Sequence, residues 1–446
     1  MMGHLDNEEA LFYEFSFDHH IPQDHLLRQI DRFLDFSLIR SKLSAHYSHT
    51  GRPSIDPELM LRMLLVGYLY GIRSERRLVE EIHFNLAYRW FCRLGLNSEV
   101  PDRSTFSKNR HGRFRESGIF RELFEQIVRQ CMENGLVGGS GMAIDGSLIE
   151  ADASYERRLP GDVLPVAWAD NEAVSRPVKE YLEALNEQAG LPQDAPKPMP
   201  LKHLSETDPQ SAWSMKSGAG RFGYFTNYLI DTDHAIIVDV DATPARTSGE
   251  IIAARHMIKR SADTFNLKPV SLAADTGYGT GPFLSWLIKQ QIEPHIPVLD
   301  RKHQTKGKIT RDAFTYDPVR NAFICPEGKF LDHRASRKKT RLDAYASRPQ
   351  DCKDCPIANQ CRTGTRRIVT RMWDEEARET VRRLSSTRAY EISMCNRKKV
   401  EMLFAHLKRH LNLRRLKLRG LAGANEEFLL AATAQNLKRL VKLVPT

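Results

Sequence analysis

The stretch Met142–Ser154 reads MAIDGSLIEADAS and follows a glycine-rich run at 138–141. Its opening residues are apolar, and the chain becomes more polar after Asp145 and Gly146. A short apolar run of this kind predicts a buried strand that ends at Asp145. The stretch marks the change from a helical N-terminal part to an α/β part that carries a carboxylate at a strand end.

Segments further along the chain complete this pattern. Residues 221–243 predict two strands joined by an Asp-Thr-Asp turn, and PVSLAADTGYG at 269–279 predicts a strand that runs into Asp275. From Met142 the expected order is strand, hairpin, helix, strand, helix, strand, insertion and helix. This order predicts an α/β protein with a ribonuclease-H-like mixed sheet flanked by helices. The other expected elements are an amphipathic helix capped by Thr247 or Ser248, a helix at 281–291, a strand at 293–298, and helices at 397–413 and 425–443.

The region before Gly138 predicts an all-α domain. Asp56 can cap its first helix and Ser74 can start its second, whereas residues 1–50 show no strong period. The expected helices lie at 57–71, 74–95, 104–114 and 118–135. Short helices with a basic third member are typical of a helix-turn-helix DNA reader, and equally of a bundle used for dimerisation.

The charge of the chain is unevenly distributed. Its 446 residues include 66 Lys and Arg against 56 Asp and Glu, a net charge of +10. The basic excess lies in 301–371 and 397–420, which favours a nucleic-acid partner over the alternative of a solvated charged surface. The acidic N-terminus lacks a signal-peptide pattern, and no apolar run approaches the ~18 residues of a membrane helix. These features argue against a secreted or membrane protein and indicate a cytosolic one.

Three carboxylates fall at positions suited to catalysis. Asp145 and Asp275 each follow an apolar strand, and ligand sites tend to lie at such strand ends. In the helix expected at 397–413, a rotation of about 100° per residue places Arg397, Glu401 and Lys408 on one polar stripe. The adjoining apolar stripe consists of Val400, Leu403, Phe404, Leu407 and Leu411. Strand-end caps and a surface Arg–Glu pair are the alternative interpretations.

These residues resemble those of the DDE-type insertion-sequence transposases of bacteria. The spacing R-x3-E-x6-K at Arg397, Glu401 and Lys408 resembles the Tyr-Arg-Glu-Lys signature of that family, with Met394 at the tyrosine position. AIDGSLIEADAS and LAADTGYG resemble the strands that carry the two aspartates of the family. SIDPELMLRMLLVGYLYGIRSERRLVEEIHFNLAYRWFCRLG resembles its N-terminal helical domain, so the resemblance extends over most of 50–440.

The resemblance implies that Asp145, Asp275 and Glu401 form a triad that binds Mg²⁺ or Mn²⁺. It implies hydrolysis at transposon ends followed by attack of the 3′-OH on target DNA, in a complex that is expected to contain a homodimer. Basic residues on and after the last catalytic helix would contact DNA: Arg397, Lys408, Arg409, Arg414 and Arg415. Trp286 could receive an extruded base, with a place in the core as the alternative, and His406 is interpreted as structural.

Four of the seven cysteines lie in the basic segment, at Cys325, Cys352, Cys355 and Cys361. Their spacing suits a tetrahedral zinc ion, which could organise a segment too polar to fold on its own core. Reduced, uncoordinated thiols are the alternative. The remaining three lie in helical patterns and are expected to be buried small apolar residues: Cys92, Cys131 and Cys395.

The expected domains are a leader at 1–50, a helical domain at 51–136, a first part of the catalytic core at 137–300 with an irregular insertion at 156–215, a basic Cys-rich insertion at 301–375, and the last part of the core at 376–446. The favoured function is a metal-dependent DNA strand-transfer enzyme, located in the bacterial cytoplasm at the nucleoid. A non-catalytic or domesticated DNA-binding protein and a nuclease without strand transfer are the alternatives.

Overall fold

The computed structural model of the protein describes residues 15–44, 47, 54–115, 117–161, 163–169, 174–189, 201–215, 218–246, 249–299 and 308–444. The chain divides into two compact units. Unit 1 comprises Met1–Gly138, Asp145–Leu267 and Lys399–Thr446, and unit 2 comprises Gly139–Ile144 and Lys268–Lys398. The expected helix caps Thr247 and Ser248 lie outside the described residues.

A mixed sheet of six strands contains the segment that begins at Met142. Its strand order is β4-β5-β1-β7-β8, with β6 also paired to β5. The strands are β1 (Gly141–Glu150), β4 (Ala212–Ser214), β5 (Arg221–Asp231), β6 (Ile236–Pro244), β7 (Ser271–Ala273) and β8 (Glu293–His295). The pairs β5–β6 and β4–β5 are antiparallel, whereas β1–β7 and β7–β8 are parallel. This is the ribonuclease-H-like mixed sheet that the element order predicted.

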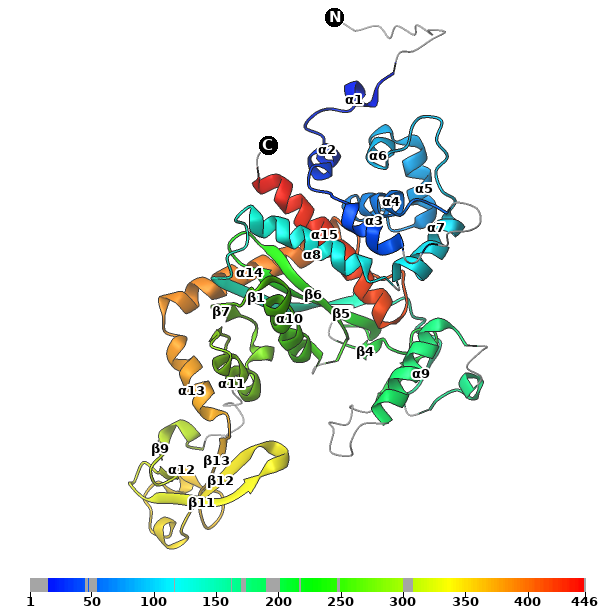
Figure 1. The fold of residues 1–446 in the computed structure, drawn as a ribbon. Helices are drawn as coiled ribbons and strands as arrows, with labels where there is room; N and C mark the ends of the chain where they lie inside the picture. Colours follow the sequence, from blue (N-terminus) through cyan, green and yellow to red (C-terminus); the bar gives the residue numbers. More distant parts are fainter. Residues whose placement is uncertain are drawn as a thin grey trace, which may run out of the picture. The chain divides into compact units, whose positions relative to one another are not determined.

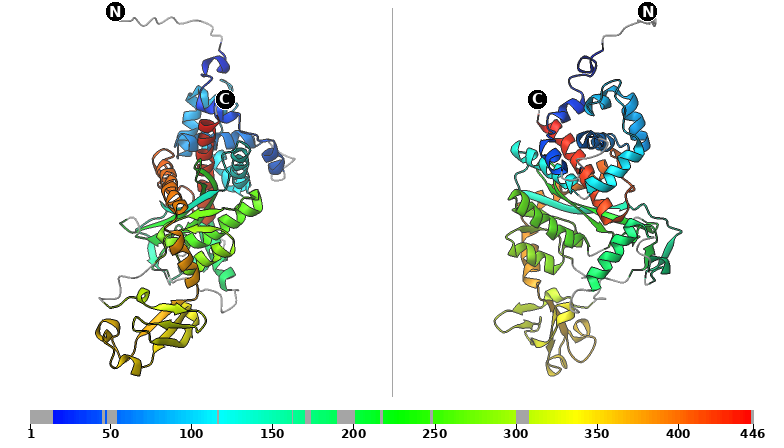
Figure 2. Two further views of the ribbon diagram at one scale, coloured as in Figure 1. Left: turned by 90° about the vertical axis from the view of Figure 1, so that its left-hand side faces the viewer. Right: turned by 45° about the vertical axis from the view of Figure 1, so that its right-hand side comes forward.

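Helices cover both sides of the β5–β6 hairpin in unit 1 (Figure 1; Figure 2). Helix α10 (Gly249–Phe265) packs on β5 and β6, and α15 (Gly420–Leu443) packs on β6 from the other side. The buried Asn436 of α15 bonds to both the N–H and the C=O of Ile237 on β6, at 2.9 and 2.7 Å. The hairpin is therefore enclosed, which agrees with the nearly continuous burial of β5.

Strand β1 is longer than the sequence predicts. It was expected to end at Asp145, but it continues to Glu150. Its pairing with β7 ends at Ala143, and its final residue is held within unit 1 instead. The Glu150 N–H donates to the carbonyl of Arg414 at 3.1 Å, and the Leu416 N–H donates to the carbonyl of Glu150 at 2.8 Å. Together with β5, the neighbour of β1 on its other side in the sheet, these backbone partners accompany the extension.

The N-terminal region is helical, as predicted, with two breaks that the periodicity did not reveal. The second expected helix divides at Asn85, which is extended and whose side chain caps the next helix by accepting from the N–H of Tyr88. The third begins after Asp102 rather than at Ser104 and ends in a π-helical turn. The elements are α4 (Pro57–Leu69), α5 (Glu75–Phe84), α6 (Leu86–Phe91), α7 (Arg103–Asn109), η1 (Arg110–Phe114) and α8 (Ile119–Glu133).

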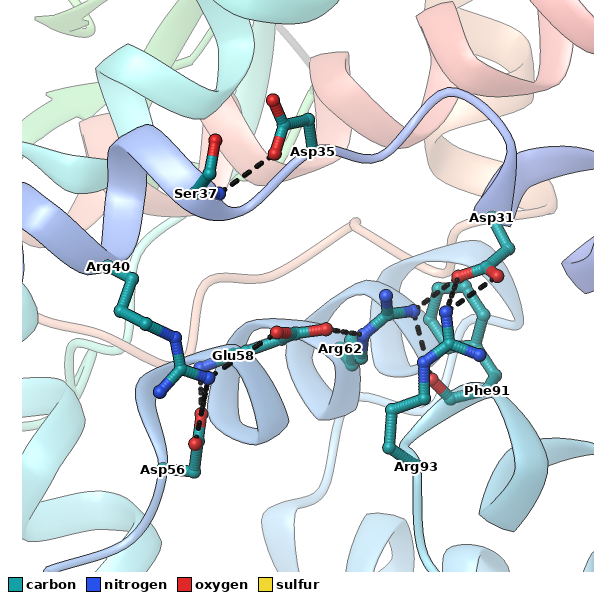
Figure 3. A network of polar contacts seen from close by, with 9 residues as sticks. All are labelled: Asp31, Asp35, Ser37, Arg40, Asp56, Glu58, Arg62, Phe91 and Arg93. Atoms are coloured by element: carbon teal, nitrogen blue, oxygen red, sulfur yellow. Dashed lines mark hydrogen bonds and ion pairs between the residues drawn. The ribbon is translucent and has the colours of Figure 1, made fainter.

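Residues 15–44 also contain helices, although no period was visible there. These are α1 (Phe17–His20), α2 (Leu26–Asp31) and α3 (Ser37–Ser44). A buried network ties them to α4 (Figure 3). The guanidinium of Arg62, almost fully buried, bonds to Asp31 at 2.6 Å, to Glu58 at 2.8 Å and to the carbonyl of Phe91 at 3.0 Å. Since Asp31 also pairs with Arg93 at 2.8 Å, these contacts fix the end of α2 against α4.

The insertion at 156–215 was expected to be irregular, and this prediction was wrong for most of the described residues. Its helix α9 spans 14 residues, and its short strands β2 and β3 pair antiparallel. Trp168, Val178 and Leu204 form a small buried cluster that holds these pieces together. The elements are β2 (Arg158–Pro160), η2 (Val166–Ala169), α9 (Arg176–Ala189) and β3 (His203–Ser205).

Unit 2 contains a second, five-stranded antiparallel sheet in the order β13-β12-β11-β10-β9. It encloses its own core around Phe314, Phe323, Leu331 and Tyr345, so the basic segment is not too polar to form one. The strands are β9 (Thr315–Asp317), β10 (Ala322–Ile324), β11 (Phe330–Arg337), β12 (Leu342–Ser347) and β13 (Ile368–Met372).

Helices complete the description of the C-terminal half. They are η3 (Thr276–Tyr278), α11 (Gly281–Lys289), η5 (Arg311–Ala313), η6 (Lys338–Thr340), η7 (Gln350–Cys352), α12 (Ala358–Cys361), α13 (Glu375–Leu384) and α14 (Arg388–Arg409). Among the described residues, no helix combines the length and apolar character needed to cross a bilayer.

Candidate active site

Asp145 lies within β1, at the point where the pairing of that strand changes. The β1–β7 register pairs Ala143 with Ala273, so Asp145 and Asp275 each follow the last paired residue of their strand by two positions. The Asp145 carboxylate accepts the N–H of Gly146 at 2.8 Å. The position of Asp145 in β1 and its hydrogen bond to the N–H of Gly146 therefore orient this carboxylate.

Asp275 follows β7 in unit 2 and is exposed. Its Oδ1 accepts the N–H of Gly277 at 2.8 Å and caps η3. A Cβ at position 277 would lie 3.0 Å from the same oxygen, so glycine leaves the carboxylate room. The capping alternative is thus present at Asp275, and it leaves the other carboxylate oxygen outside this hydrogen bond.

Glu401 lies on α14, which is longer than the helix predicted from 397. The expected apolar stripe is confirmed, since its members are buried: Val400, Leu403, Phe404, Leu407 and Leu411. Glu401 is exposed, Arg397 is partly buried, and Lys408 is half-buried. Burial lowers the pKa of Lys408, and Arg414 adds to the effect. The helix therefore presents a carboxylate between two cations on its solvent-facing border.

The other predicted DNA contacts follow α14. Arg409 is exposed, and the Arg414 side chain donates to the carbonyl of Lys408 at 3.3 Å. Arg415 is in an ion pair with Asp152 at 3.2 Å, and it keeps half of its side-chain surface exposed. These cations lie beside the end of β1, since the backbone of 414–416 bonds to Glu150.

His406 and Trp286, for which the sequence suggested a structural role and a possible base contact, are both partly buried. His406 faces Gln435 of α15 at 3.2 Å, and burial lowers its pKa to about 4, which agrees with a structural role. The Trp286 ring stacks on Phe283 with centroids 5.9 Å apart.

The structure places two catalytic candidates, Asp145 and Glu401, in unit 1 and Asp275 in unit 2. In the part of the chain that is described, no three or more His, Cys, Asp or Glu side chains are arranged as a metal centre. The donor set nevertheless fits a hard cation, because all three side chains are carboxylates and Mg²⁺ prefers oxygen ligands.

The four clustered cysteines all lie in unit 2, but the structure does not arrange three or more of these described residues as a metal centre. Burial raises the pKa of the Cys361 thiol, and the neighbouring Cys352, Cys325 and Cys355 raise it further. Cys325 sits in a tight turn, where its sulfur accepts the N–H of Lys329 at 3.3 Å.

The three remaining cysteines behave differently from one another. Cys92 and Cys131 are buried, as predicted, and burial raises the pKa of each thiol to about 12. Cys395 was also expected to be buried, but it is exposed. It lies on α14 away from the stripe that begins at Val400, so helical context alone did not determine its burial.

Two residues near Asp145 were not anticipated from the sequence. Glu250, in the first turn of α10, and Asn227, on β5, both approach Gly146. An acidic residue in a first turn is common because it complements the helix dipole, so the sequence offered no specific signal for Glu250. Asn227 stands out only as a polar residue inside a strongly apolar strand.

Comparison with known proteins identifies the family. Residues 188–437, more than half of the chain, match the family model described as Transposase DDE domain, and residues 15–112 match Transposase domain (DUF772). The chain therefore belongs to the DDE-domain transposase family. The first match includes Asp275 and Glu401, whereas Asp145 lies between the two matched ranges.

The chain is also similar to a cryo-EM structure of a piggyBac transposase synaptic complex with hairpin DNA. The sequence identity is 10% and the TM-score is 0.33, over 93% of this chain and 72% of that chain.

Proposed function

We propose that the protein is the transposase of a bacterial insertion sequence, which binds terminal inverted repeats, cleaves at them and joins the freed 3′-OH to target DNA. The strongest support is the register of β1 and β7 in a chain of the DDE family. In this register Asp145 and Asp275 each come two positions after the last paired residue of β1 and β7, respectively. The substrate would place the protein at the nucleoid in the bacterial cytoplasm.

In this proposal Asp145, Asp275 and Glu401 hold Mg²⁺ or Mn²⁺. When bound, two such ions activate an attacking oxygen and neutralise the charge that develops on the leaving oxygen. The protein orients these carboxylates through β1, through η3 and through the buried face of α14. Such fixed placement matters because small displacements of the reacting groups cost large factors in rate.

Arg397 and Lys408 flank Glu401 and would hold phosphates of the transposon end. In cleavage, a bond forms between a water oxygen and phosphorus while the P–O3′ bond breaks, which leaves a free 3′-OH. In strand transfer, that oxygen bonds to a target phosphorus while the target P–O3′ bond breaks, so the number of phosphodiester bonds is conserved.

The test uses the full chain, Mg²⁺ and DNA that carries the terminal repeats of the element itself. We expect cleavage and joined products from the wild type, and loss of both from Asp145→Asn and Glu401→Gln. The matched control is Asp263→Asn, an exposed aspartate on α10, which should retain both. Binding without cleavage would support a non-catalytic DNA-binding protein, and cleavage without joining would support a nuclease. Intact cleavage by Asp145→Asn would refute the site assignment.

We further propose that Cys325, Cys352, Cys355 and Cys361 bind one structural zinc ion, supported by their C-x2-C-x5-C spacing with an earlier Cys-Pro and by the electrostatic influence of the other three thiols on Cys361. Metal analysis of the purified protein is expected to find stoichiometric zinc, and Cys355→Ser should lower the zinc content and the melting temperature. The control is Cys395→Ser, which replaces an exposed thiol outside the cluster. A wild-type zinc content well below stoichiometry would contradict the idea.

We also propose a homodimer in the complex that joins two DNA ends. Sedimentation of the protein with end DNA should reveal two chains per complex, and a single chain would contradict this part.

A further inference from the structure

Two oxygen atoms converge on Gly146, the residue after Asp145. A Cβ at position 146 would lie 2.8 Å from Oε1 of Glu250 and 2.9 Å from Oδ1 of Asn227. Both distances are shorter than real Cβ contacts allow, so only glycine fits without a shift. All of these residues belong to unit 1. A carboxylate oxygen from α10 and an amide oxygen from β5 therefore both lie within 3 Å of one point beside Asp145.

The orientation of the Asn227 amide is determined by its neighbours. Its Nδ2 donates to the carbonyl of Asp241 at 3.0 Å and to Oγ1 of Thr243 at 3.1 Å. A flipped amide would turn its oxygen toward the Asp241 carbonyl, which cannot donate, and would lose that bond. The Oδ1 therefore points toward Gly146.

This amide oxygen lacks a donor. Asn227 is fully buried, and its Oδ1 has no hydrogen-bond partner among the residues that the structure describes. A buried acceptor without a donor destabilises the folded protein. Such an atom persists in a folded protein when something else satisfies it, such as a proton, a water molecule or a cation.

The Glu250 carboxylate oxygen approaches the same point. Its negative charge would attract a cation to the Asn227 oxygen. A proton on Glu250 could donate to Asn227. A divalent cation could instead attract both oxygens, and a carboxylate with an amide oxygen is a donor set that Mg²⁺ and Mn²⁺ accept.

We infer that Glu250 is a fourth carboxylate of the metal site at Asp145, and that the Asn227 amide oxygen is a neutral member of the same site. This inference rests on the proposed function, because it assumes that Asp145 binds the catalytic cation. Gly146 allows the approach of both oxygens by having no side chain. The adjacent Asp145 has its carboxylate held by the N–H of that same glycine.

The experiment measures Mg²⁺ and Mn²⁺ binding to the full chain by calorimetry, together with the rise in melting temperature that each ion produces. Four proteins are compared: the wild type, Glu250→Gln, Asp145→Asn and the control Glu133→Gln. Glu133 is an exposed glutamate at the end of α8. We expect Glu250→Gln to weaken Mn²⁺ binding about 10–100-fold, the range for residues that support a metal site. The control should bind as the wild type does.

The Glu250→Gln variant also tests the alternative that a proton on Glu250, and not a cation, satisfies the Asn227 oxygen. Its amide can donate to Asn227, so a proton-bridged pair would fold normally in Glu250→Gln and bind metal with unchanged affinity. Unchanged affinity in Glu250→Gln beside weakened affinity in Asp145→Asn would overturn the inference and leave the proposed site standing. Unchanged affinity in both variants would count against the proposed function itself.

A second variant keeps the test decisive if Glu250→Gln does not fold. Asn227→Asp preserves the shape and places a charge beside Glu250. If a cation lies there, this variant should melt below the wild type without metal and show a larger rise in melting temperature with Mn²⁺. An equal or smaller rise would overturn the inference.

Discussion

Within unit 1, buried charges as well as apolar contacts attach the end of α2 to α4. Arg62 lies on α4, a helix whose residues are otherwise largely apolar and buried, and it has 2% of its surface exposed. Its guanidinium also lies over the rings of Phe36 and Phe91, at 4.9 and 5.1 Å from their centroids. Burying a guanidinium requires paired acceptors, and Asp31 and Glu58 provide them.

Replacement of Arg62 tests this arrangement. Arg62→Leu should lower the free energy of unfolding by about 3 kcal/mol, because it leaves two carboxylates without their partner in a partly buried place. Urea denaturation followed by circular dichroism measures the change. Arg76→Leu removes the exposed pair with Glu80 and should change the free energy by less than about 1 kcal/mol. Equal effects of the two substitutions would contradict the proposed importance of the Arg62 network.

Helix α14 owes its position to α15 and β5 as much as to its own amphipathic pattern. Gln435 of α15 donates to the carbonyl of Leu403 at 2.8 Å and accepts from Tyr228 of β5 at 3.0 Å, and it also meets His406. The periodicity of α14 predicted which face is buried. It could not predict the hydrogen bonds of Gln435 to Leu403, Tyr228 and His406, because Gln435 and Tyr228 are far from α14 in the sequence.

The contact between His406 and Gln435 makes the stability of the protein depend on pH, and the direction follows from the pKa of His406. Burial holds the pKa of His406 at about 4, below its ordinary value of 6.5. The stability that the neutral, buried His406 contributes is therefore fully present above pH 6.5. It is lost as the pH falls toward 4, because the unfolded chain binds the proton more readily than the folded one. We expect the melting temperature to fall across this window, and His406→Gln to reduce that fall. Burial raises the pKa of Asp208 to about 6, an effect of opposite sign, so the comparison of the two proteins isolates the histidine. An unchanged pH profile in His406→Gln would refute this role.

Helix α9, in the insertion at 156–215, was not predicted from the sequence. Helix α9 has apolar residues at helical spacing, with Val178 and Leu182 four residues apart, but many polar residues and prolines around it concealed the pattern. In the mixed sheet, β1, β5, β6, β7 and β8 were predictable because each is an apolar run beside turn residues, whereas β4 and the five strands of the second sheet were not predicted. The extension of β1 to Glu150 was not predictable either, because its partners, β5 and residues 414–416, are distant in the sequence.

Across the whole molecule, the sequence indicated three candidate carboxylates but not the residues that surround them. The two aspartates were identified by their strand ends and Glu401 by its place on a helix stripe. Glu250 and Asn227 reach Gly146 through the packing of α10 and the pairing of β5, and neither distance along the chain nor composition signals that convergence.

The distribution of charge leads to a prediction for DNA binding. The net charge of +10 is small for the chain, but its cations are concentrated in two segments, one of which includes α14. If Arg397 and Lys408 each neutralise one phosphate, Arg397→Ala and Lys408→Ala should each reduce the slope of log affinity against log salt by about 0.9. Fluorescence anisotropy with end DNA measures the slope. The control Arg32→Ala alters an exposed cation after α2, and equal slopes in all four proteins would contradict the phosphate contacts.

The crowding around Gly146 bears on how related genes are read. Every missense change in a glycine codon adds a Cβ, and here it would press on an amide that is already held by two hydrogen bonds. A related chain with any other residue at position 146 must therefore shift Asn227 or Glu250 to make room for the added Cβ.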